Sequence, residues 1–241
     1  MSDVRFERID PPRAHEIVAE QIRRHVGLRL ISRGDVLPPE RELARRFGVG
    51  RATVQQALRE LEADGLIDSR RGRHGGTFVL GPAAGDPALA PLLEEARKAR
   101  GDVADALHFR AVIEPAAAAL AAERRDAADL ERLRRAVAAT AGARADDEAF
   151  MRHDTAFHLA VAEAARNRFL GEAVERERLE LNRVFPLLPA SPAWHSRSAA
   201  EHARVLDAIE DADPAAAREA MALHVGHSAD SVMALLGALG T

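Results

Sequence analysis

Residues 37–66 read LPPERELARRFGVGRATVQQALRELEADGL. Two prolines followed by acidic residues favour a helix start, so we expect a helix over about 40–47 that stops at Gly48. A second helix is expected over about 51–63, with a glycine cap at Gly65. Two short helices separated by such a tight turn indicate a helix-turn-helix.

The expected helix over 51–63 has one apolar and one polar face. The apolar residues recur at i, i+3, i+4 and i+7 and are Val54, Ala57, Leu58 and Leu61. The polar face carries side chains of the kinds that contact phosphates and base edges in DNA, namely Arg51, Thr53, Gln55, Gln56 and Arg59. Arg41, at the start of the preceding helix, is placed to reach a phosphate beside the groove. The alternative is the solvated face of an ordinary surface helix.

A third helix is expected upstream, over about 14–30, and a β-hairpin downstream. Two short strands, at 66–69 and 77–80, flank a basic, glycine-rich turn at 70–76. Glycines in this turn permit close approach to a backbone and arginines supply positive charge; they are Gly72, Gly75, Gly76, Arg70, Arg71 and Arg73. Three helices followed by a hairpin with a basic tip predict a winged helix-turn-helix.

The remainder of the chain has a purely helical pattern. Two Pro and two Gly within 81–87 indicate a linker, and we expect a DNA-binding domain over 1–80, a linker over 81–90 and an all-helical domain over 91–237. Six or seven helices are expected, at about 88–99, 102–123, 126–143, 146–166, 168–188, 194–211 and 214–237. The fold class is therefore mainly α, a winged helix-turn-helix followed by an antiparallel helix bundle.

The amino-acid composition limits which cross-links, metal ligands and charged partners the chain can have. The chain has 241 residues and no cysteine, so disulfides and cysteine-ligated zinc are excluded and any metal must be held by His, Asp or Glu. Residues 1–80 carry 15 Arg against 12 acidic residues, a balance of +3, whereas the rest carries 19 basic against 26 acidic residues, a balance of −7. This asymmetry has the sign expected if the first third meets phosphate.

Membrane insertion and secretion are not expected. No apolar run approaches the roughly 20 residues of a membrane helix, and the N-terminus lacks the apolar segment of a signal peptide. We therefore expect a cytoplasmic location and no membrane partner.

Four side chains in the helical part form a candidate metal site. Asp154 and His158 are spaced i and i+4, which places both on one helix face, while His202 and His224 lie on the last two expected helices. Three imidazoles and one carboxylate suit zinc, nickel, manganese or iron. The alternative is that each His is a surface or core residue, since the chain has 10 of them.

Arg110 is a candidate for binding an effector. It lies on a helix with a largely apolar face, and a guanidinium that faces inward can hold a carboxylate with two hydrogen bonds. The alternative is a structural pair with Glu114, four residues along the helix. His153 and His227 neighbour the candidate ligands, but helix geometry turns them away from the site.

The stretch from Leu37 to Leu66, with the wing 73–79, closely resembles the GntR family of transcription regulators. The resemblance implies a homodimer on a pseudo-palindromic operator in double-stranded DNA, with Arg41, Arg51, Thr53 and Gln55 as DNA contacts and Gly72 and Arg73 at the wing. Two departures stand out. Gly50 stands where the family usually has Ser or Thr, which gives up a side-chain N-cap, and Gln55 stands where many members have Arg.

The helical part resembles the FCD ligand-binding domain of the FadR subfamily, in FRAVIE at 109–114, DTAFH at 154–158, EHARVLDAI at 201–209 and MALH at 221–224. The resemblance implies that the four candidate ligands bind a divalent metal, zinc first, with positions left open for a small carboxylate effector. We thus expect a ligand-responsive regulator, a repressor, and not an enzyme. Two alternatives are a metal-dependent enzyme built on the bundle and a DNA-binding protein whose bundle only dimerises.

Overall fold

The computed structural model describes residues 13–70, 72, 75–81, 94, 98–184 and 191–238. Within them the chain forms two compact units, one from α1–α3 and the strands β1 and β2, the other from α5–α10. Each is described by itself. Among the described helices, none combines the length and apolar character that crossing a membrane requires.

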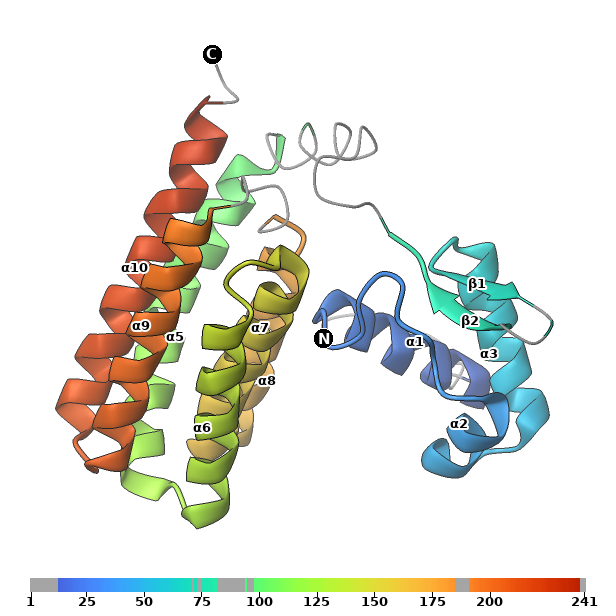
Figure 1. Ribbon diagram of the computed structural model, residues 1–241, viewed down its shortest axis with the longest axis horizontal. Coiled ribbons are helices and arrows are strands. Elements are labelled where there is room, and N and C mark those ends of the chain that lie inside the picture. The colour runs from blue at the N-terminus through green and yellow to red at the C-terminus, as the bar shows by residue number, and fades with distance from the viewer. Residues whose placement is uncertain are drawn as a thin grey trace, which may run out of the picture. The chain divides into compact units, whose positions relative to one another are not determined.

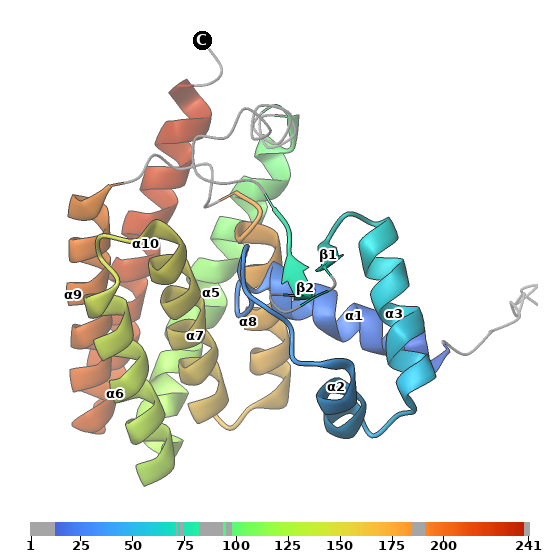
Figure 2. The same ribbon diagram turned by 45° about the vertical axis from the view of Figure 1, so that its right-hand side comes forward.

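The first unit is the predicted winged helix-turn-helix (Figures 1 and 2). Its helices are α1 (Ala14–Gly27), α2 (Glu40–Phe47) and α3 (Arg51–Ala63). α2 ends at Gly48, whose φ of 65° is the left-handed conformation that glycine adopts without strain. The four predicted apolar residues of α3 are buried. As expected, Gly50 precedes α3 without a side-chain cap.

The wing is a two-stranded antiparallel hairpin. β1 (Ile67–Arg70) pairs with β2 (Gly76–Val79) in a register that sets Ile67 opposite Val79 and Arg70 opposite Gly76. Both strands lie one residue from their predicted limits. Ile67 and Val79 are buried, and β1 packs on α3, so the hairpin is anchored at its base.

The second unit is a helix bundle, with its helices roughly aligned (Figure 1). They are α5 (Arg100–Arg124), α6 (Ala127–Gly142), α7 (Asp147–Ala164), α8 (Arg168–Leu181), α9 (Pro192–Glu210) and α10 (Pro214–Ala238). α5 packs against four of the others, α7, α8, α9 and α10. Alanines such as Ala117, Ala118 and Ala121 are fully or nearly fully buried on α5, which lets its neighbours approach closely.

Helix starts in the bundle are set by local caps. The Asp126 carboxylate accepts a hydrogen bond from the Asp129 amide, and the Asp126 amide donates one to the Asp129 carboxylate, which forms a capping box. Asp146 accepts from the Ala149 amide at the start of α7. Asp213 accepts from two amides of the first turn of α10. The expected helix starts near 126, 146 and 214 therefore coincide with Asp, a preferred N-cap residue.

The predicted end of α8 is wrong, and the helix predicted at 88–99 falls mostly outside the described residues. α8 ends at Leu181 rather than near 188, because a proline at 186 would clash with the carbonyl of residue 182 if the helix continued. The expected helix at 88–99 lies almost entirely outside the described residues, as do Arg73 and the central prolines 186 and 189.

Candidate metal centre and DNA-reading face

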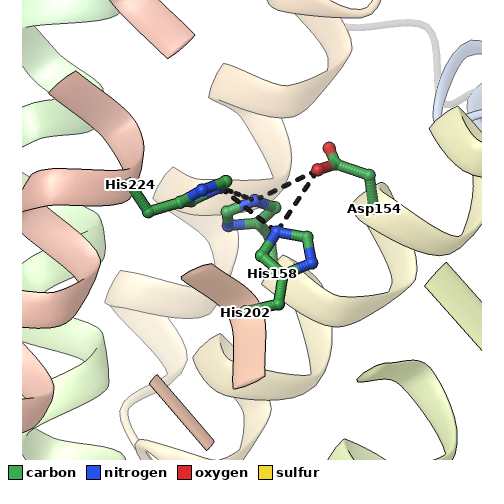
Figure 3. Close-up of side chains that lie close together, drawn as sticks. All are labelled: Asp154, His158, His202 and His224. Atoms are coloured by element: carbon green, nitrogen blue, oxygen red, sulfur yellow. Dashed lines mark hydrogen bonds and ion pairs between the residues drawn. The ribbon is translucent and has the colours of Figure 1, made fainter. Parts of the chain in front are cut away.

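Asp154, His158, His202 and His224 converge inside the bundle (Figure 3). Asp154 and His158 come from α7, His202 from α9 and His224 from α10. Each is buried, and one candidate ligand atom from each lies within 4.8 Å of the others. The four residues predicted from sequence as ligands therefore meet at one place.

The atoms that meet are lone-pair donors. His224 Nε2 lies 3.1 Å from His158 Nε2 and 3.2 Å from His202 Nε2. Asp154 Oδ1 lies 3.4 Å from His202 Nε2 and 3.8 Å from His158 Nε2. Three imidazole nitrogens and one carboxylate oxygen are a donor set that first-row divalent metals favour.

Two carboxylates hold the outer sides of these imidazoles. Glu114 Oε2 is hydrogen-bonded to His158 Nδ1, and Glu201 Oε2 lies 3.0 Å from His224 Nδ1. A carboxylate at Nδ1 favours the tautomer with the proton there and the lone pair on Nε2. The Nε2 lone pairs of His158 and His224 then point toward the same place, where one cation could accept both.

The protonation states also suit a metal. Burial lowers the pKa of His202 and lowers that of His224 well below its usual value, aided for His224 by its neighbouring imidazoles. Burial opposes ionisation of Asp154, but the Arg178 guanidinium and the neighbouring His158 and His202 side chains hold the pKa of that carboxyl well below its usual range. Neutral imidazoles and an ionised carboxylate are the forms that bind metals.

Two buried arginines flank the four side chains. Arg178 of α8 donates to Asp154 Oδ2 at 2.6 Å and to Thr155 Oγ1 at 2.9 Å. Arg110 of α5 donates from Nε to Glu114 Oε1 at 2.7 Å, and its Nη2 lies 3.1 Å from His158 Nε2. The structural pair with Glu114 is thus formed, and the same guanidinium reaches the metal-facing side of His158.

Glu177 is a further buried acid beside these groups. Its Oε1 lies 3.8 Å from Arg110 Nε, and neither carboxyl oxygen has a hydrogen-bond partner among the described residues. Burial raises the pKa of Glu177 to about 7, with the charge of Glu114 acting in the same direction and that of Arg110 against it.

The neighbouring histidines stay out of the cluster, as expected. His153 of α7 is partly exposed. His227 has a side chain that is 47% exposed, and its Nδ1 lies 2.6 Å from Glu201 Oε1. Glu201 therefore joins a surface histidine to the buried His224.

The predicted DNA contacts lie on the outer side of α2 and α3. Arg51, Gln56 and Arg41 are exposed, while Thr53 and Gln55 are partly buried. Glu40, the first residue of α2, accepts a hydrogen bond from Gln55 Nε2 at 2.8 Å and lies 3.5 Å from Arg51 Nη2.

The rest of this face is also held by local contacts. Gln56 Oε1 accepts from Arg59 Nη2 at 2.6 Å. At the wing, Gly72 is exposed and has a φ of 109°, which side chains rarely adopt. Arg73 lies outside the described residues.

Arg178, Glu177 and Glu201 were not singled out in the sequence analysis. The signal for the first two is their place in an apolar stripe, because Val174 and Leu181 on the same helix are buried at i and i+7. Charged side chains inside such a stripe are buried and must have partners. The signal for Glu201 is weaker, because it only adjoins His202.

Two family comparisons decide the identity of the chain. Residues 14–79 match the family described as "Bacterial regulatory proteins, gntR family", and residues 105–227 match the FCD domain. The chain belongs to the GntR family. Members of this family are transcription regulators, so the enzyme alternative is set aside and DNA binding is the role of the first unit.

Proteins similar to this GntR-family chain are also named as transcription regulators. It is 32% identical over 206 residues to the transcriptional regulator LutR of Bacillus subtilis, covering 82% of this chain and 91% of LutR. It is 30% identical to a putative L-lactate dehydrogenase operon regulatory protein of Escherichia coli, covering 89% and 84%. It is 31% identical to the transcriptional repressor NanR of Cronobacter sakazakii, covering 87% and 82%.

A solved structure supports the fold. The chain aligns with E. coli McbR/YncC at a TM-score of 0.54 and 18% identity, covering 96% of this chain and 100% of the other. At this identity the likeness concerns the fold alone.

Proposed function

We propose that the helical unit of this regulator binds a divalent metal ion through Asp154, His158, His202 and His224. The observation that carries the proposal is the facing Nε2 atoms of His158 and His224, 3.1 Å apart, each with a carboxylate at its Nδ1. Zinc is the first candidate, followed by nickel, manganese and iron, because all accept imidazole and carboxylate ligands.

The effector we propose is a small carboxylate. With four protein ligands, zinc would have to expand its coordination to five to accept a carboxylate oxygen, whereas metals that take six oxygen and nitrogen ligands keep positions free for it. Arg110, whose Nη2 lies 3.1 Å from His158 Nε2, would supply the guanidinium partner for the same carboxylate. A relative named for an L-lactate dehydrogenase operon favours an acid of this kind.

The DNA reader is assigned to residues 1–80, with 81–90 as linker and 91–237 as effector and dimerisation domain. Exposed or partly exposed groups support Arg41, Arg51, Thr53, Gln55 and Gln56 as contacts to DNA, with Gly72 and Arg73 at the wing. A homodimer would place one α3 helix in each half of a pseudo-palindromic operator. Exposed Phe109 and Val112 on α5 favour dimerisation through the helical unit.

Regulation follows if the effector prefers one arrangement of the dimer. A ligand shifts a conformational equilibrium only through unequal affinity for the two states. We propose repression relieved by the effector, in line with the name of the repressor NanR. The remaining alternative is a bundle that only dimerises, which would bind neither metal nor acid.

The test begins with metal-stripped protein and its His158→Ala variant. Zinc should bind the wild type and raise its melting temperature, whereas His158→Ala should lose more than about 100-fold in affinity, beyond the 10–100-fold typical of residues that only support a ligand. His153→Ala, on the same helix, is the matched control. Equal zinc binding by all three proteins would refute the site.

The effector is tested on the same preparations. Small carboxylates should stabilise the zinc-loaded wild type, and this response should vanish on chelation and return with added zinc. A carboxylate response that survives chelation would show that the acid binds without the metal.

A further inference from the structure

His202 is the one imidazole of the candidate metal centre whose outer nitrogen has no hydrogen-bond partner among the described residues. Its Nε2 faces the other candidate ligands (Figure 3) and lies 3.2 Å from His224 Nε2, whereas its Nδ1 is buried and unpaired. The outer nitrogens of His158 and His224 are each held by a carboxylate. Histidines that bind metals almost always donate from this second nitrogen, so His202 calls for a partner there.

Ser198 is a candidate for this partner. It precedes His202 by one turn of α9, so the two side chains lie on one face of the helix, and a helical side chain leans toward the turn before it. Ser198 is 2% exposed and His202 is 0% exposed. The Ser198 hydroxyl, like His202 Nδ1, has no hydrogen-bond partner among the described residues. Buried polar atoms without a partner are rare, and these two lie one helical turn apart.

The surroundings of His202 offer few other partners. One face of its ring stacks on Phe157, with ring centroids 4.0 Å apart. Among the other buried polar side chains described on α9, His195 is bonded to a backbone carbonyl, and both oxygens of Glu201 are bonded to histidines of α10. Ser198 is the buried polar side chain of this helix that remains to serve His202.

We propose that the Ser198 hydroxyl positions His202 as a metal ligand by bonding to its Nδ1, directly or through one water molecule. This inference rests on the proposed function and adds a positioning residue to that site. With a metal on Nε2, the neutral ring carries its proton on Nδ1, and the hydroxyl oxygen accepts it. Ser198 thereby fixes the rotation of this ring, as the carboxylates do for His158 and His224.

A hydroxyl suits His202 better than a third carboxylate would. Nε2 of His202 lies 3.4 Å from Asp154 Oδ1, so in the metal-free protein it can donate to that carboxylate, which leaves Nδ1 as an acceptor. A hydroxyl donates to Nδ1 in that form and accepts from it in the metal-bound form, whereas an ionised carboxylate only accepts. Ser198 therefore pairs with His202 whether or not a metal is bound.

The experiment measures metal binding by the full-length protein and four variants. Competition with a chromogenic chelator gives the zinc affinity, and cobalt in place of zinc gives a visible absorption spectrum that depends on the ligand geometry. Ser198→Ala removes the hydroxyl, while Ser198→Thr and Ser198→Val share one shape and differ in keeping or losing it. Ser228→Ala is the matched control, because Ser228 is also buried, lies one turn from His224 and already donates to the His224 carbonyl oxygen.

Ser198→Ala should bind zinc about 10–100-fold more weakly than the wild type, as is typical when a group that orients a ligand is removed. The cobalt spectrum of the saturated variant should also change. Ser198→Thr should bind zinc more tightly than Ser198→Val, and Ser228→Ala should keep the wild-type affinity and spectrum. A serine with a merely structural role would alter the melting temperature of the metal-free protein but not the spectrum of the saturated one.

Three results would overturn the inference. They are an unchanged zinc affinity or an unchanged cobalt spectrum in Ser198→Ala, equal zinc affinities in Ser198→Thr and Ser198→Val, and the same losses in Ser228→Ala as in Ser198→Ala. In each case the proposed metal site stands, because the wild type still binds zinc. If the two branched variants do not fold, the comparison of Ser198→Ala with Ser228→Ala decides. Absence of zinc binding by the wild type would instead refute the proposed function.

Discussion

Arg51 in α3 and Arg178 in α8 carry the same guanidinium in opposite surroundings. The Arg51 side chain is 66% exposed and lies 3.5 Å from Glu40, whereas the Arg178 side chain is 0% exposed and donates to Asp154 at 2.6 Å. Water solvates an exposed charge well, so its partner can be exchanged at little cost. A buried charge depends on its partner, so it fixes the positions of the groups around it. The surface around Arg51 is therefore suited to contacts that change with the ligand. The interior around Arg178 is suited to a site whose side chains keep fixed positions.

The largest expected effect tests the buried side of this contrast. Arg178→Met would leave Asp154 as a buried charge without its cation, and breaking a buried pair costs about 3–5 kcal/mol. Denaturant unfolding of metal-stripped protein measures the free energy. Arg168→Met, on the same helix but exposed and paired with Glu172, should cost less than about 1 kcal/mol. Similar losses in both variants would contradict the contrast.

Glu201→Gln should weaken metal binding by about 10–100-fold. Glu201 accepts from His224 Nδ1 at 3.0 Å, and such contacts orient a ligand and raise its basicity. Competition with a chromogenic chelator gives the affinity. The control is Asp207→Asn, at an exposed position on the same helix, which should leave the metal affinity unchanged. An unchanged metal affinity in Glu201→Gln would show that Glu201 does not support the metal site.

Arg51→Ala tests the exposed arginine of this comparison. It should weaken specific DNA binding by about 1–3 kcal/mol if Arg51 reads a base, while the free energy of unfolding stays within about 0.5 kcal/mol of wild type, as for most surface substitutions. A fluorescence-anisotropy titration against an operator selected from random DNA gives the first value. Unchanged affinity for the selected operator would exclude this role.

The smallest expected effect concerns the N-cap position of α3. Gly50 has φ −68° and ψ 152° and no side-chain cap, and a Cβ there meets only Thr53 Oγ1 at 4.0 Å. Gly50→Ser should therefore raise stability by a few tenths of a kcal/mol through a new N-cap. Thermal unfolding followed by circular dichroism measures it, and a lower melting temperature would show that the serine does not form the cap.

The predictions that succeeded rest on local physics. The bounds of α2 and α3 follow from prolines, glycines and apolar spacing within about 30 residues, and the starts of α6 and α7 follow from Asp caps. The pairing of Asp154 with His158 follows from helix geometry alone. Local signals of this kind need no knowledge of the rest of the fold.

What was missed, or was predicted only through the family resemblance, depends on contacts between residues far apart in the sequence. That His202 and His224 join the α7 pair was carried by a family resemblance, because spacing cannot bring three helices together. Arg178 and Glu177 were missed because their partners lie on α5 and α7, 23 or more residues away in sequence from the nearest contact. A charge in an apolar stripe shows that a partner exists but not which residue it is.

Glu40 gives the DNA-reading face a built-in competitor. Its carboxylate accepts a hydrogen bond from Gln55 and lies beside Arg51, so if these two side chains contact DNA as proposed, the DNA must first replace both contacts. A phosphate backbone alone, itself anionic, meets repulsion from Glu40 and offers Gln55 little in exchange. A matching base edge offers the amide two hydrogen bonds. If Arg51 and Gln55 contact DNA as proposed, Glu40 lowers the affinity for DNA in general more than the affinity for a matching sequence, and the time spent on other sequences becomes shorter.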